Sequence, residues 1–353
     1  MQLFPTLYYD ILEKVNSINP IKYAANRNYK DGNITRLSPY ISRGVISTRF
    51  IYEKLIKKEL NLKKCEKFIQ ELAWRDFWQQ IWLNKGNSIN KDLKRTQEDV
   101  NDFKIAKSLV EAKTGINSVD EEINNLYKNG YMHNHMRMYV ASIATNIAKS
   151  HWKVPAKWMY YHLLDGDWAS NSLSWQWVAG SNSNKKYYAN QDNINKYFYS
   201  DQKNTFLDNR YEFISSMKIP KEVEEKYDLE LSSNLQNNKE IKIDNSLPTL
   251  IYNYYNIDPN WRKDENVNRI LIFEPKVFNK YPVSQKCIDF SLNLSKNIKD
   301  IQIYYGNFEE FCSKYNVSNL IFKEHPLNKH YSGLEDQRDW LFKIEGEYLS
   351  FFK

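Results

Sequence analysis

The sequence predicts a mainly α-helical protein that ends in a small α/β segment with a parallel sheet. Apolar residues recur at spacings of three and four through roughly the first 200 residues, which is the period of helices packed on a core. The chain contains only 10 glycines, too few for an all-β fold rich in turns. Beyond residue 268, short apolar runs alternate with helical patterns, which is the order of β–α–β units.

The helices of the first part follow from this spacing. The clearest spans residues 66–83, where Phe68, Leu72, Trp78 and Ile81 form an apolar stripe. Further helices are expected over 41–60, 119–128, 133–149 and 157–164. Residues 86–106 are polar and are expected to form a long surface loop.

The last part of the chain is expected to contain three strands. Apolar runs at 269–273, 301–305 and 319–322 are separated by helical patterns at 284–297 and 308–315. Because a sheet of three strands exposes both edges, we expect it to dock on the helical part or to be completed by further strands.

The chain is therefore expected to divide into three parts. These are a helical domain (1–205), a polar linker with weak helices (206–267) and a small α/β domain (268–353). Residues 1–205 hold 30 Lys and Arg against 20 Asp and Glu, a balance of +10, whereas the rest hold 20 against 23. The basic surplus indicates a polyanionic partner such as nucleic acid, and a lysine-rich solvated surface is the alternative.

Several classes of protein are not expected. No basic segment followed by an apolar run opens the chain, and no run of 18 apolar residues occurs, so neither a signal peptide nor a membrane span is predicted. The cysteines at 65, 287 and 312 are odd in number and far apart, which indicates reduced thiols in the cytoplasm rather than disulfides or an iron–sulfur cluster. We expect a monomer without a bound metal.

Residues 131–180 are the most unusual stretch of the sequence. Five tryptophans fall among charged and amide side chains there. Because buried polar groups are costly unless each finds a partner, this mixture indicates a cavity built around a large, planar ligand with polar edges. The tryptophans are Trp152, Trp158, Trp168, Trp175 and Trp177.

A cluster of hydroxyls and arginines lies near the N-terminus. It comprises residues 23–28, residues 35–40 and Gly44. Hydroxyls and an arginine at the start of a helix can bind phosphate. Ser38 and Pro39 can equally be a simple helix N-terminus, so both interpretations stay open.

Two further clusters lie on predicted helices. Glu71, Trp74, Arg75 and Trp78 share one helix side, which alone is also compatible with a salt-bridged amphipathic helix. In the stretch 132–138, two histidines at positions i and i+2 point to different sides, so a zinc site is not expected there.

These clusters, taken in order, resemble the FAD-binding domain of the photolyase/cryptochrome family. The resemblance covers about residues 20–205 and rests on five motifs that occur in the family's order. The motifs read TRLSPYISRGVIS, ELAWRDF, KTGINSVD, MHNHMRMYVAS and DGDWASNSLSWQW.

The resemblance implies a helical domain that holds FAD in a folded, U-shaped form. It implies that Asp165 and Asp167 bind the adenine side and the flavin ring, that Arg137 pairs with Asp165, and that Asn171 faces the flavin N5. An amide at N5 can donate or accept a hydrogen bond, which suits more than one redox state. The residues implied for the phosphates and the ribityl chain are Tyr23, Thr35, Arg36, Leu37, Ser38 and Arg75.

The resemblance also implies a DNA partner and a light-driven lyase reaction. Reduced FAD would pass an electron to a flipped-out cyclobutane pyrimidine dimer, whose ring then splits. Relatives that act on (6-4) photoproducts carry histidines where this chain has Asn134 and Met138, which favours cyclobutane dimers. The residues implied for the lesion are Arg27, Glu71, Trp74, Asn134, Met138 and Trp177.

The sequence departs from the family pattern in three places. The antenna domain that usually precedes the flavin domain is expected to be absent, and the C-terminal α/β segment can be a reduced or relocated counterpart. Trp175 and Trp152 match two tryptophans of the family's electron relay, but Leu109 stands where the outer one belongs. The segment after residue 177 also departs from the family's sequence pattern, so the resemblance does not predict which of its residues contact the lesion.

Two alternative functions remain at this stage. One is a cryptochrome-like flavoprotein that uses the same cofactor for signalling and repairs nothing. The other is a helical nucleic-acid binder without a cofactor, which would not explain Asp165, Asp167 and Asn171.

Overall fold

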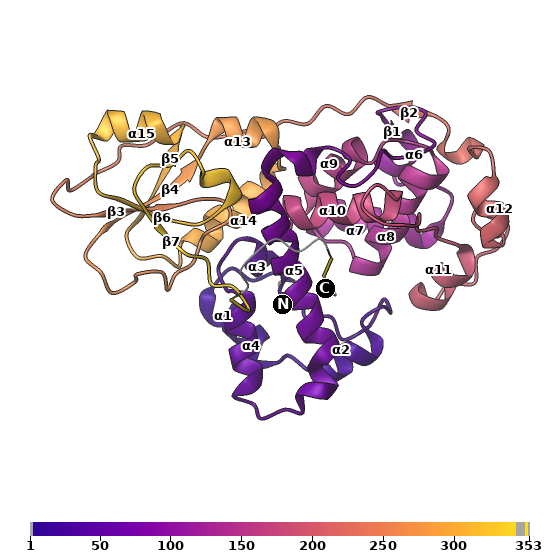
Figure 1. Cartoon of the computed structure of the whole chain (residues 1–353), viewed down its shortest axis with the longest axis horizontal. Coiled ribbons are helices and arrows are strands. Elements are labelled where there is room, and N and C mark those ends of the chain that lie inside the picture. The colour runs from indigo at the N-terminus through magenta and orange to yellow at the C-terminus, as the bar shows by residue number, and fades with distance from the viewer. Residues whose placement is uncertain (1–2, 344–349, 352–353) are drawn as a thin grey trace. The chain divides into compact units, whose positions relative to one another are not determined.

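The computed structural model describes residues 3–343 and 350–351 and forms two compact units (Figure 1). Each unit is assembled from separate stretches of sequence. The sheet unit comprises Met1–Ile18, Thr35–Leu83 and Ser232–Lys353, and the helical unit comprises Asn19–Ile34 and Asn84–Leu231.

The sheet unit contains a parallel sheet with the strand order β5-β4-β3-β6-β7. The three expected strands are present as β4, β5 and β6, and β3 and β7 complete the sheet, as one of the two sequence-based alternatives predicted. The strands are β3 (Thr249–Tyr252), β4 (Asn268–Phe273), β5 (Ile301–Tyr305), β6 (Leu320–Lys323) and β7 (Leu334–Asp336).

Strand β3 lies inside the stretch expected to be a linker, yet all four of its residues are buried. It pairs with β4 on one side and β6 on the other. Parallel strands are buried on both faces and therefore form short continuous apolar runs. The run TLIY is brief and follows a long polar stretch, so it gave a weak signal in the sequence.

Among its described residues, the sheet unit also contains seven α-helices. Side-chain caps fix two of their starts: Ser47 Oγ accepts a hydrogen bond from Phe50 N at 2.8 Å, and Asn307 with Glu310 forms a capping box. The helices are α1 (Tyr8–Asn16), α3 (Ser38–Ser42), α4 (Thr48–Ile56), α5 (Leu62–Lys85), α13 (Pro275–Lys280), α14 (Gln285–Ser295) and α15 (Phe308–Tyr315). A short 3₁₀ turn, η4, spans Pro326–Asn328.

The single helix expected over 41–60 was wrong, because the chain breaks at Gly44 and forms α3 and α4 instead. Gly44 has a φ of +66°, a left-handed conformation that glycine adopts without a Cβ penalty. A Cβ at this position would lie 2.5 Å from the carbonyl oxygen of Tyr255. The close approach of another backbone segment therefore requires glycine here.

We expect Gly44→Ala to lower the free energy of unfolding by about 2 kcal/mol, from left-handed strain plus the clash. Gly86→Ala is the matched control, because Gly86 also has a positive φ (+52°) but nothing lies within 4 Å of its would-be Cβ. The control substitution should lower the free energy of unfolding by only about 1 kcal/mol. Equal losses in chemical denaturation would show that the approach of Tyr255 does not matter.

The helical unit is built from short helices and one two-stranded ribbon. Its helices are α2 (Pro20–Asn26), α6 (Lys107–Val110), α7 (Asn117–Asn129), α8 (Asn134–Ser142), α9 (Lys153–His162), α10 (Trp168–Ala179), α11 (Gln191–Phe198) and α12 (Tyr211–Ser216). Strands β1 (Ile105–Ala106) and β2 (Lys226–Tyr227) pair antiparallel. The 3₁₀ turns are η1 (Gly86–Asn90) and η3 (Lys221–Val223), and η2 (Ile143–Ile147) is a π-helical turn.

Helix α10 lies at the centre of the helical unit and packs against α8 and α9. Two tryptophans of these helices have structural hydrogen bonds: Trp168 of α10 donates to Asn90 Oδ1 at 2.8 Å, and Trp158 of α9 donates to the Tyr127 hydroxyl at 3.0 Å. The helix expected over 133–149 ends earlier, because the π-helical turn η2 follows α8. Across the described residues, every helix is too short or too polar to span a bilayer.

Candidate functional site

A tight turn between α9 and α10 brings two buried carboxylates together. Asp165 and Asp167 are 5% and 2% exposed, and Gly166 separates them. A Cβ on Gly166 would lie 2.9 Å from the Leu163 carbonyl oxygen and 3.1 Å from that of Tyr160. Glycine is therefore what allows the turn to place both aspartates next to α10.

The first aspartate forms the ion pair that the resemblance implied. Arg137 Nη2 on α8 donates to Asp165 Oδ2 at 2.9 Å, and Arg137 Nε donates to the Met132 carbonyl at 2.9 Å. Burial works against the charged guanidinium, but Asp165, with smaller contributions from Tyr131 and Glu122, outweighs it and raises the pKa of Arg137 above its ordinary value. The guanidinium therefore stays charged and holds the Asp165 carboxylate in the interior of the unit.

The second aspartate also has a structural role, which the sequence analysis did not predict. Asp167 is the N-cap of α10 and accepts hydrogen bonds from Ala169 N, Ser170 N and the Ser170 hydroxyl, at 3.3, 3.3 and 2.6 Å. This cap orients the first turn of the helix. A ligand that binds Asp167 therefore has to use the same carboxylate oxygens that accept the cap hydrogen bonds.

Asn171 lies one turn further along α10 and links that helix to α9. Its amide Nδ2 donates to the Ala156 carbonyl at 2.8 Å. This bond uses one of the two amide hydrogens and leaves the Oδ1 acceptor for a ligand. Asn171 is half-buried, so its position is fixed while one edge stays accessible.

The predicted phosphate-binding segment forms the start of α3 in the sheet unit. Leu37 is its N-cap and is only 1% exposed, so a ligand could use its backbone but not its side chain. Arg36 adopts a positive φ of 52°, and Arg75 on α5 is hydrogen-bonded to Ser42. Ser38 and Pro39 are the first two residues of α3, as expected if this segment is simply a helix N-terminus. The phosphate roles of Thr35, Arg36, Leu37, Ser38 and Arg75, and of Tyr23 on α2, stay predictions.

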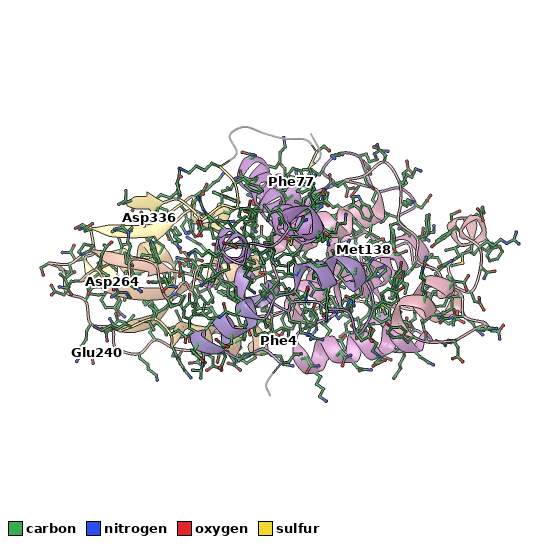
Figure 2. All side chains as sticks on the ribbon, turned by 90° about the horizontal axis from the view of Figure 1, so that it is seen from below. Phe4, Phe77, Met138, Glu240, Asp264 and Asp336 are labelled. Carbon is green, nitrogen blue, oxygen red and sulfur yellow. The ribbon has the colours of Figure 1, made fainter. Side chains whose placement is uncertain are left out.

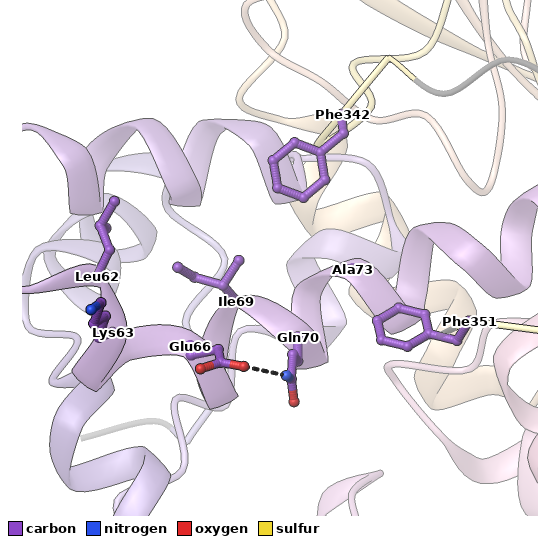
Figure 3. Close-up of a pocket in the computed structure, with 8 residues that line it drawn as sticks. All are labelled: Leu62, Lys63, Glu66, Ile69, Gln70, Ala73, Phe342 and Phe351. Atoms are coloured by element: carbon purple, nitrogen blue, oxygen red, sulfur yellow. Dashed lines mark hydrogen bonds between the residues drawn. The ribbon is translucent and has the colours of Figure 1, made fainter. Parts of the chain in front are cut away.

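Helix α5 carries an aromatic cluster around Trp74. The Trp74 ring lies 5.0 Å from Trp78 and 5.5 Å from Phe77. Phe351, from the C-terminal end of the chain, stacks nearly parallel on Trp74 with the ring centroids 3.9 Å apart. Figure 3 shows Phe342 and Phe351 beside an open groove of about 440 Å³ along α5. A lesion-stacking role for Trp74 would therefore require its face to be shared with Phe351.

Asp76 on the same helix is partly buried, and its carboxylate accepts hydrogen bonds from Thr48 Oγ1, at 3.0 Å, and from Leu341 N, at 2.7 Å. Burial raises the pKa of Asp76 to about 6, and these hydrogen bonds offset only part of that effect. The folded protein therefore binds this proton more tightly than the unfolded chain does.

We expect the free energy of unfolding to fall as the pH rises from about 4 to 6, by roughly 2 kcal/mol from Asp76 alone. The stabilisation is complete below the unfolded pKa and is lost as the pH passes the folded one. Denaturation curves across this range should show the slope as a difference between wild type and Asp76→Asn, because that subtraction removes the other carboxylates. Parallel pH profiles would contradict the assignment.

The helical unit places three lesion candidates on or near its surface. Trp177 is 40% exposed, Asn134 is exposed at the start of α8, and Met138, labelled in Figure 2, lies one turn later. Tyr187 packs against Trp177 at 5.9 Å and stacks on the buried Tyr139 of α8 at 6.5 Å. These tyrosines connect the exposed tryptophan to the helix that carries Asn134 and Met138.

The two histidines of the MHNHM motif have structural roles. His133 Nδ1 caps α8 by accepting from His135 N at 3.2 Å, and His135 Nδ1 donates to the Asn28 carbonyl at 3.2 Å. Burial lowers the pKa of His135, against the opposing effect of the Asn28 bond. His135 therefore ties the turn after Arg27 to the start of α8 in its neutral form.

The positions predicted to form the electron relay lie in the core of the helical unit. Trp152 is fully buried, Trp175 is 2% exposed, and Leu109 is a fully buried core residue of α6. The indole Nε1 of Trp152 donates to Asp92 Oδ1 at 2.7 Å. Sequence reasoning missed Asp92, because it stands in a polar loop with no motif around it.

The carboxyl ends of β3 and β6 form the switch point of the sheet, where open α/β sheets usually bind ligands. Side chains of the sheet unit fill this place. Tyr255 stacks on the buried His325 at 4.5 Å, and Trp82 lies edge-on to both rings at 6.3 and 5.3 Å. Arg43 covers the neighbouring Tyr254 ring at 3.6 Å.

Together, the buried arginine–aspartate pair and the capped helix that follows it form a fixed polar site in the helical unit. A family model described as the FAD binding domain of DNA photolyase matches residues 68–256, just over half of the chain. The chain belongs to this family and carries its FAD-binding domain.

Individual relatives agree with this assignment. A deoxyribodipyrimidine photo-lyase from Alkalihalophilus pseudofirmus is 32% identical over 161 residues, which cover 44% of this chain and 34% of the relative. A Cryptochrome DASH from Danio rerio is 34% identical over 152 residues, covering 41% and 29%. The chain thus spans about a third of the length of the curated relatives it matches.

A solved structure shows the same fold. The cryptochrome of Synechocystis sp. PCC6803 superposes with a TM-score of 0.51 at 24% identity, covering 55% of this chain and 44% of that one. At this level of identity the likeness concerns the fold alone.

Proposed function

We propose that the protein repairs cyclobutane pyrimidine dimers in DNA by light-driven electron transfer from reduced FAD. The observation that carries the proposal is the surface of the helical unit, where an exposed tryptophan, Trp177, accompanies Asn134 and Met138. A large aromatic that is 40% exposed indicates a binding surface rather than a core. The relatives named deoxyribodipyrimidine photo-lyase support this choice.

On the cofactor side, the chain supplies binding and electrostatics, while FAD supplies the one-electron chemistry. Asp165, held by Arg137, provides a fixed negative charge, and Asn171 provides an accessible amide edge beside it. Both positions are set before the ligand arrives, because hydrogen bonds to α8 and α9 hold them. Such preorganisation avoids reorganisation of the site during electron transfer.

On the lesion side, stacking and amide hydrogen bonds would recognise the flipped-out dimer. Stacking of a base on an aromatic side chain contributes about 1–3 kcal/mol, and a damaged step is already poorly stacked, which lowers the cost of flipping it. Trp177 offers such a surface, and Asn134 offers an amide for the base edges. Arg27, Glu71, Trp74 and Met138 keep the roles that the resemblance gives them.

The second candidate is a cryptochrome-like photoreceptor without repair activity. The 34% identity to a Cryptochrome DASH favours it over any class outside the family. The third possibility, a nucleic-acid binder without a cofactor, does not agree with the family assignment.

Repair is tested by mixing protein whose FAD has been chemically reduced with DNA that contains cyclobutane dimers, under blue light. We expect intact pyrimidines to be recovered in the light and not in the dark. Asn134→Ala should lose most of this activity, and Asn124→Ala, an exposed asparagine of α7, is the matched control. A yellow protein that leaves the dimers intact would exclude repair and favour the photoreceptor.

A further inference from the structure

The relay tryptophan Trp152 is directly hydrogen-bonded to a carboxylate. Its Nε1–H lies 2.7 Å from Asp92 Oδ1. The indole is fully buried, and the aspartate side chain is 16% exposed. A general base has to lie within about 2.6–3.2 Å of the atom whose proton it removes, so Asp92 is in position for this role.

A closed network of hydrogen bonds fixes this geometry. Gln97 N donates to Asp92 Oδ2 at 2.9 Å, and Gln97 Oε1 accepts from Trp152 N at 2.9 Å. Gln97 Nε2 also donates to the Ser150 carbonyl at 3.0 Å. The carboxylate and the indole are therefore held to each other through both side chain and backbone.

The neighbouring histidine supports Asp92 and does not replace it. His151 Nδ1 accepts from Lys153 N at 3.3 Å, which places the ring hydrogen on Nε2. Nε2 faces Asp92 Oδ1 at 3.3 Å and therefore donates to it. Among these groups, Asp92 alone has free acceptor capacity beside the indole, so it is the base.

The helix geometry brings Trp152 to the same end of α9 and α10 as Trp175. A short connection joins the two helices, which is typical of antiparallel neighbours. Asn171 on α10 is bonded to Ala156 on α9. Trp175 follows Asn171 by one turn and Trp152 precedes Ala156 by one turn, so both tryptophans extend in the same direction from that contact.

The next step of the family's relay has no tryptophan in this chain. Leu109 fills the outer position and is fully buried. The His151 ring lies beside Trp152 at a centroid distance of 5.6 Å, and a neutral imidazole is a poor electron donor. The oxidised state therefore has to be stabilised at Trp152 by a means other than a further electron hop.

We propose that Asp92 ends the relay by taking the indole proton of Trp152. This inference rests on the proposed function and on the electron relay that the resemblance implies, in which Trp175 would give one electron to light-excited, oxidised FAD. Trp152 then gives one electron to Trp175 and becomes a radical cation, whose Nε1–H is far more acidic than that of indole. The N–H bond breaks, the proton forms an O–H bond on Asp92, and a neutral Trp152 radical remains.

This proton transfer stabilises the charge separation. The electron can return to Trp152 only if the proton also returns from Asp92, which slows recombination. An external thiol then reduces the neutral radical, and the proton moves back to the indole nitrogen. The partly buried carboxylate of Asp92 thus takes over the stabilisation that an exposed outer tryptophan would provide by moving the charge further from the flavin.

The experiment is flash photolysis of protein loaded with oxidised FAD, in H₂O and D₂O, with the tryptophan radical followed by its absorption. In wild type we expect the neutral radical, formed more slowly in D₂O and at a rate independent of buffer concentration. Asp92→Asn keeps an acceptor oxygen but is not a base. It should give the cation form and lower the yield of photoreduction at least about tenfold.

Asp99→Asn is the matched control, because Asp99 is a 62% exposed carboxylate whose ion pair is with Lys186. It should behave as wild type. FAD absorbance and circular dichroism show whether Asp92→Asn still folds. If it does not, the deuterium and buffer measurements on wild type decide the question. A neutral radical formed at the wild-type rate in Asp92→Asn, or a rate that follows buffer concentration, would overturn the proposal.

The failure of this inference can be told apart from failure of the function on which it rests. Trp152→Phe and Trp175→Phe that photoreduce FAD normally would show that the relay itself is wrong. If both lose photoreduction while Asp92→Asn does not, only the proton acceptor is wrong. Repair is assayed with chemically reduced FAD, so it does not depend on either outcome.

Discussion

Replacement of Arg137 by methionine should release FAD and lower the free energy of unfolding by about 3–5 kcal/mol. The reason is the environment of Asp165, whose side chain is 4% exposed and whose charge is balanced by Arg137 at 2.9 Å. Without the guanidinium, an unbalanced carboxylate remains in the interior. Chemical denaturation measures the loss of stability, and the absorbance of bound flavin measures the loss of cofactor.

A double variant separates these two effects. Arg137→Met combined with Asp165→Leu removes the whole pair, and replacing a buried pair by apolar residues is often neutral for stability. We therefore expect stability to recover while FAD binding does not, because the ligand's partner has gone. Arg137→Lys should lie between wild type and Arg137→Met, since an ammonium restores the charge but not the fork of donors. A double variant with wild-type FAD affinity would contradict a flavin role for Asp165.

The sequence predicted most of the elements whose signal is local. Helix α15 begins and ends where its apolar spacing predicted, and β4 and β5 follow their apolar runs within a residue. The errors have long-range causes. The helix expected over 41–60 is broken because Gly44 meets the backbone of Tyr255, more than 200 positions later. Strand β7 was not expected, because Leu334–Asp336 is polar and becomes a strand only by pairing with β6.

In the candidate site, too, a feature with a local signal was predicted, and those that depend on distant residues were not. The pair of Arg137 with Asp165 followed from the motifs, which place residue types at fixed spacing. Asp92 and Phe351 did not, because each becomes relevant only through a partner far along the chain: Trp152 for the first and Trp74 for the second. The cap formed by Asp167 is local, and the pattern D-x-x-S before an apolar run could have suggested it.

Replacement of Trp74 by alanine should lower the affinity for dimer-containing DNA by about 100-fold, near the upper end of what one stacked base contributes. The proposed function makes Trp74 a stacking surface, and Trp74 is half-buried in the aromatic cluster of α5. Trp78→Ala is the matched control, because Trp78 lies 5.0 Å from Trp74 on the same helix and has no predicted lesion contact. Equal losses from both variants would indicate a general effect on α5 instead of stacking.

Replacement of Phe351 by alanine should have the opposite effect and raise the affinity for dimer-containing DNA. Its ring is nearly parallel to Trp74, with an interplanar angle of 12° at 3.9 Å, so a base that stacks on that face has to displace it. An aromatic pair contributes about 0.5–1.5 kcal/mol, so Phe351→Ala should tighten lesion binding by up to about tenfold. Titration of dimer-containing and undamaged DNA measures the change, which should be confined to the damaged strand.

The double variant decides whether the two residues act on one surface. If Phe351 only covers Trp74, removing it matters only while Trp74 is present, so Trp74→Ala with Phe351→Ala should bind like Trp74→Ala alone. Such non-additivity is the expected result for residues in direct contact. If Phe351→Ala instead weakens binding, Phe351 supports the lesion surface and does not compete for it. Additive effects would mean that the stack on Trp74 is not where the lesion binds.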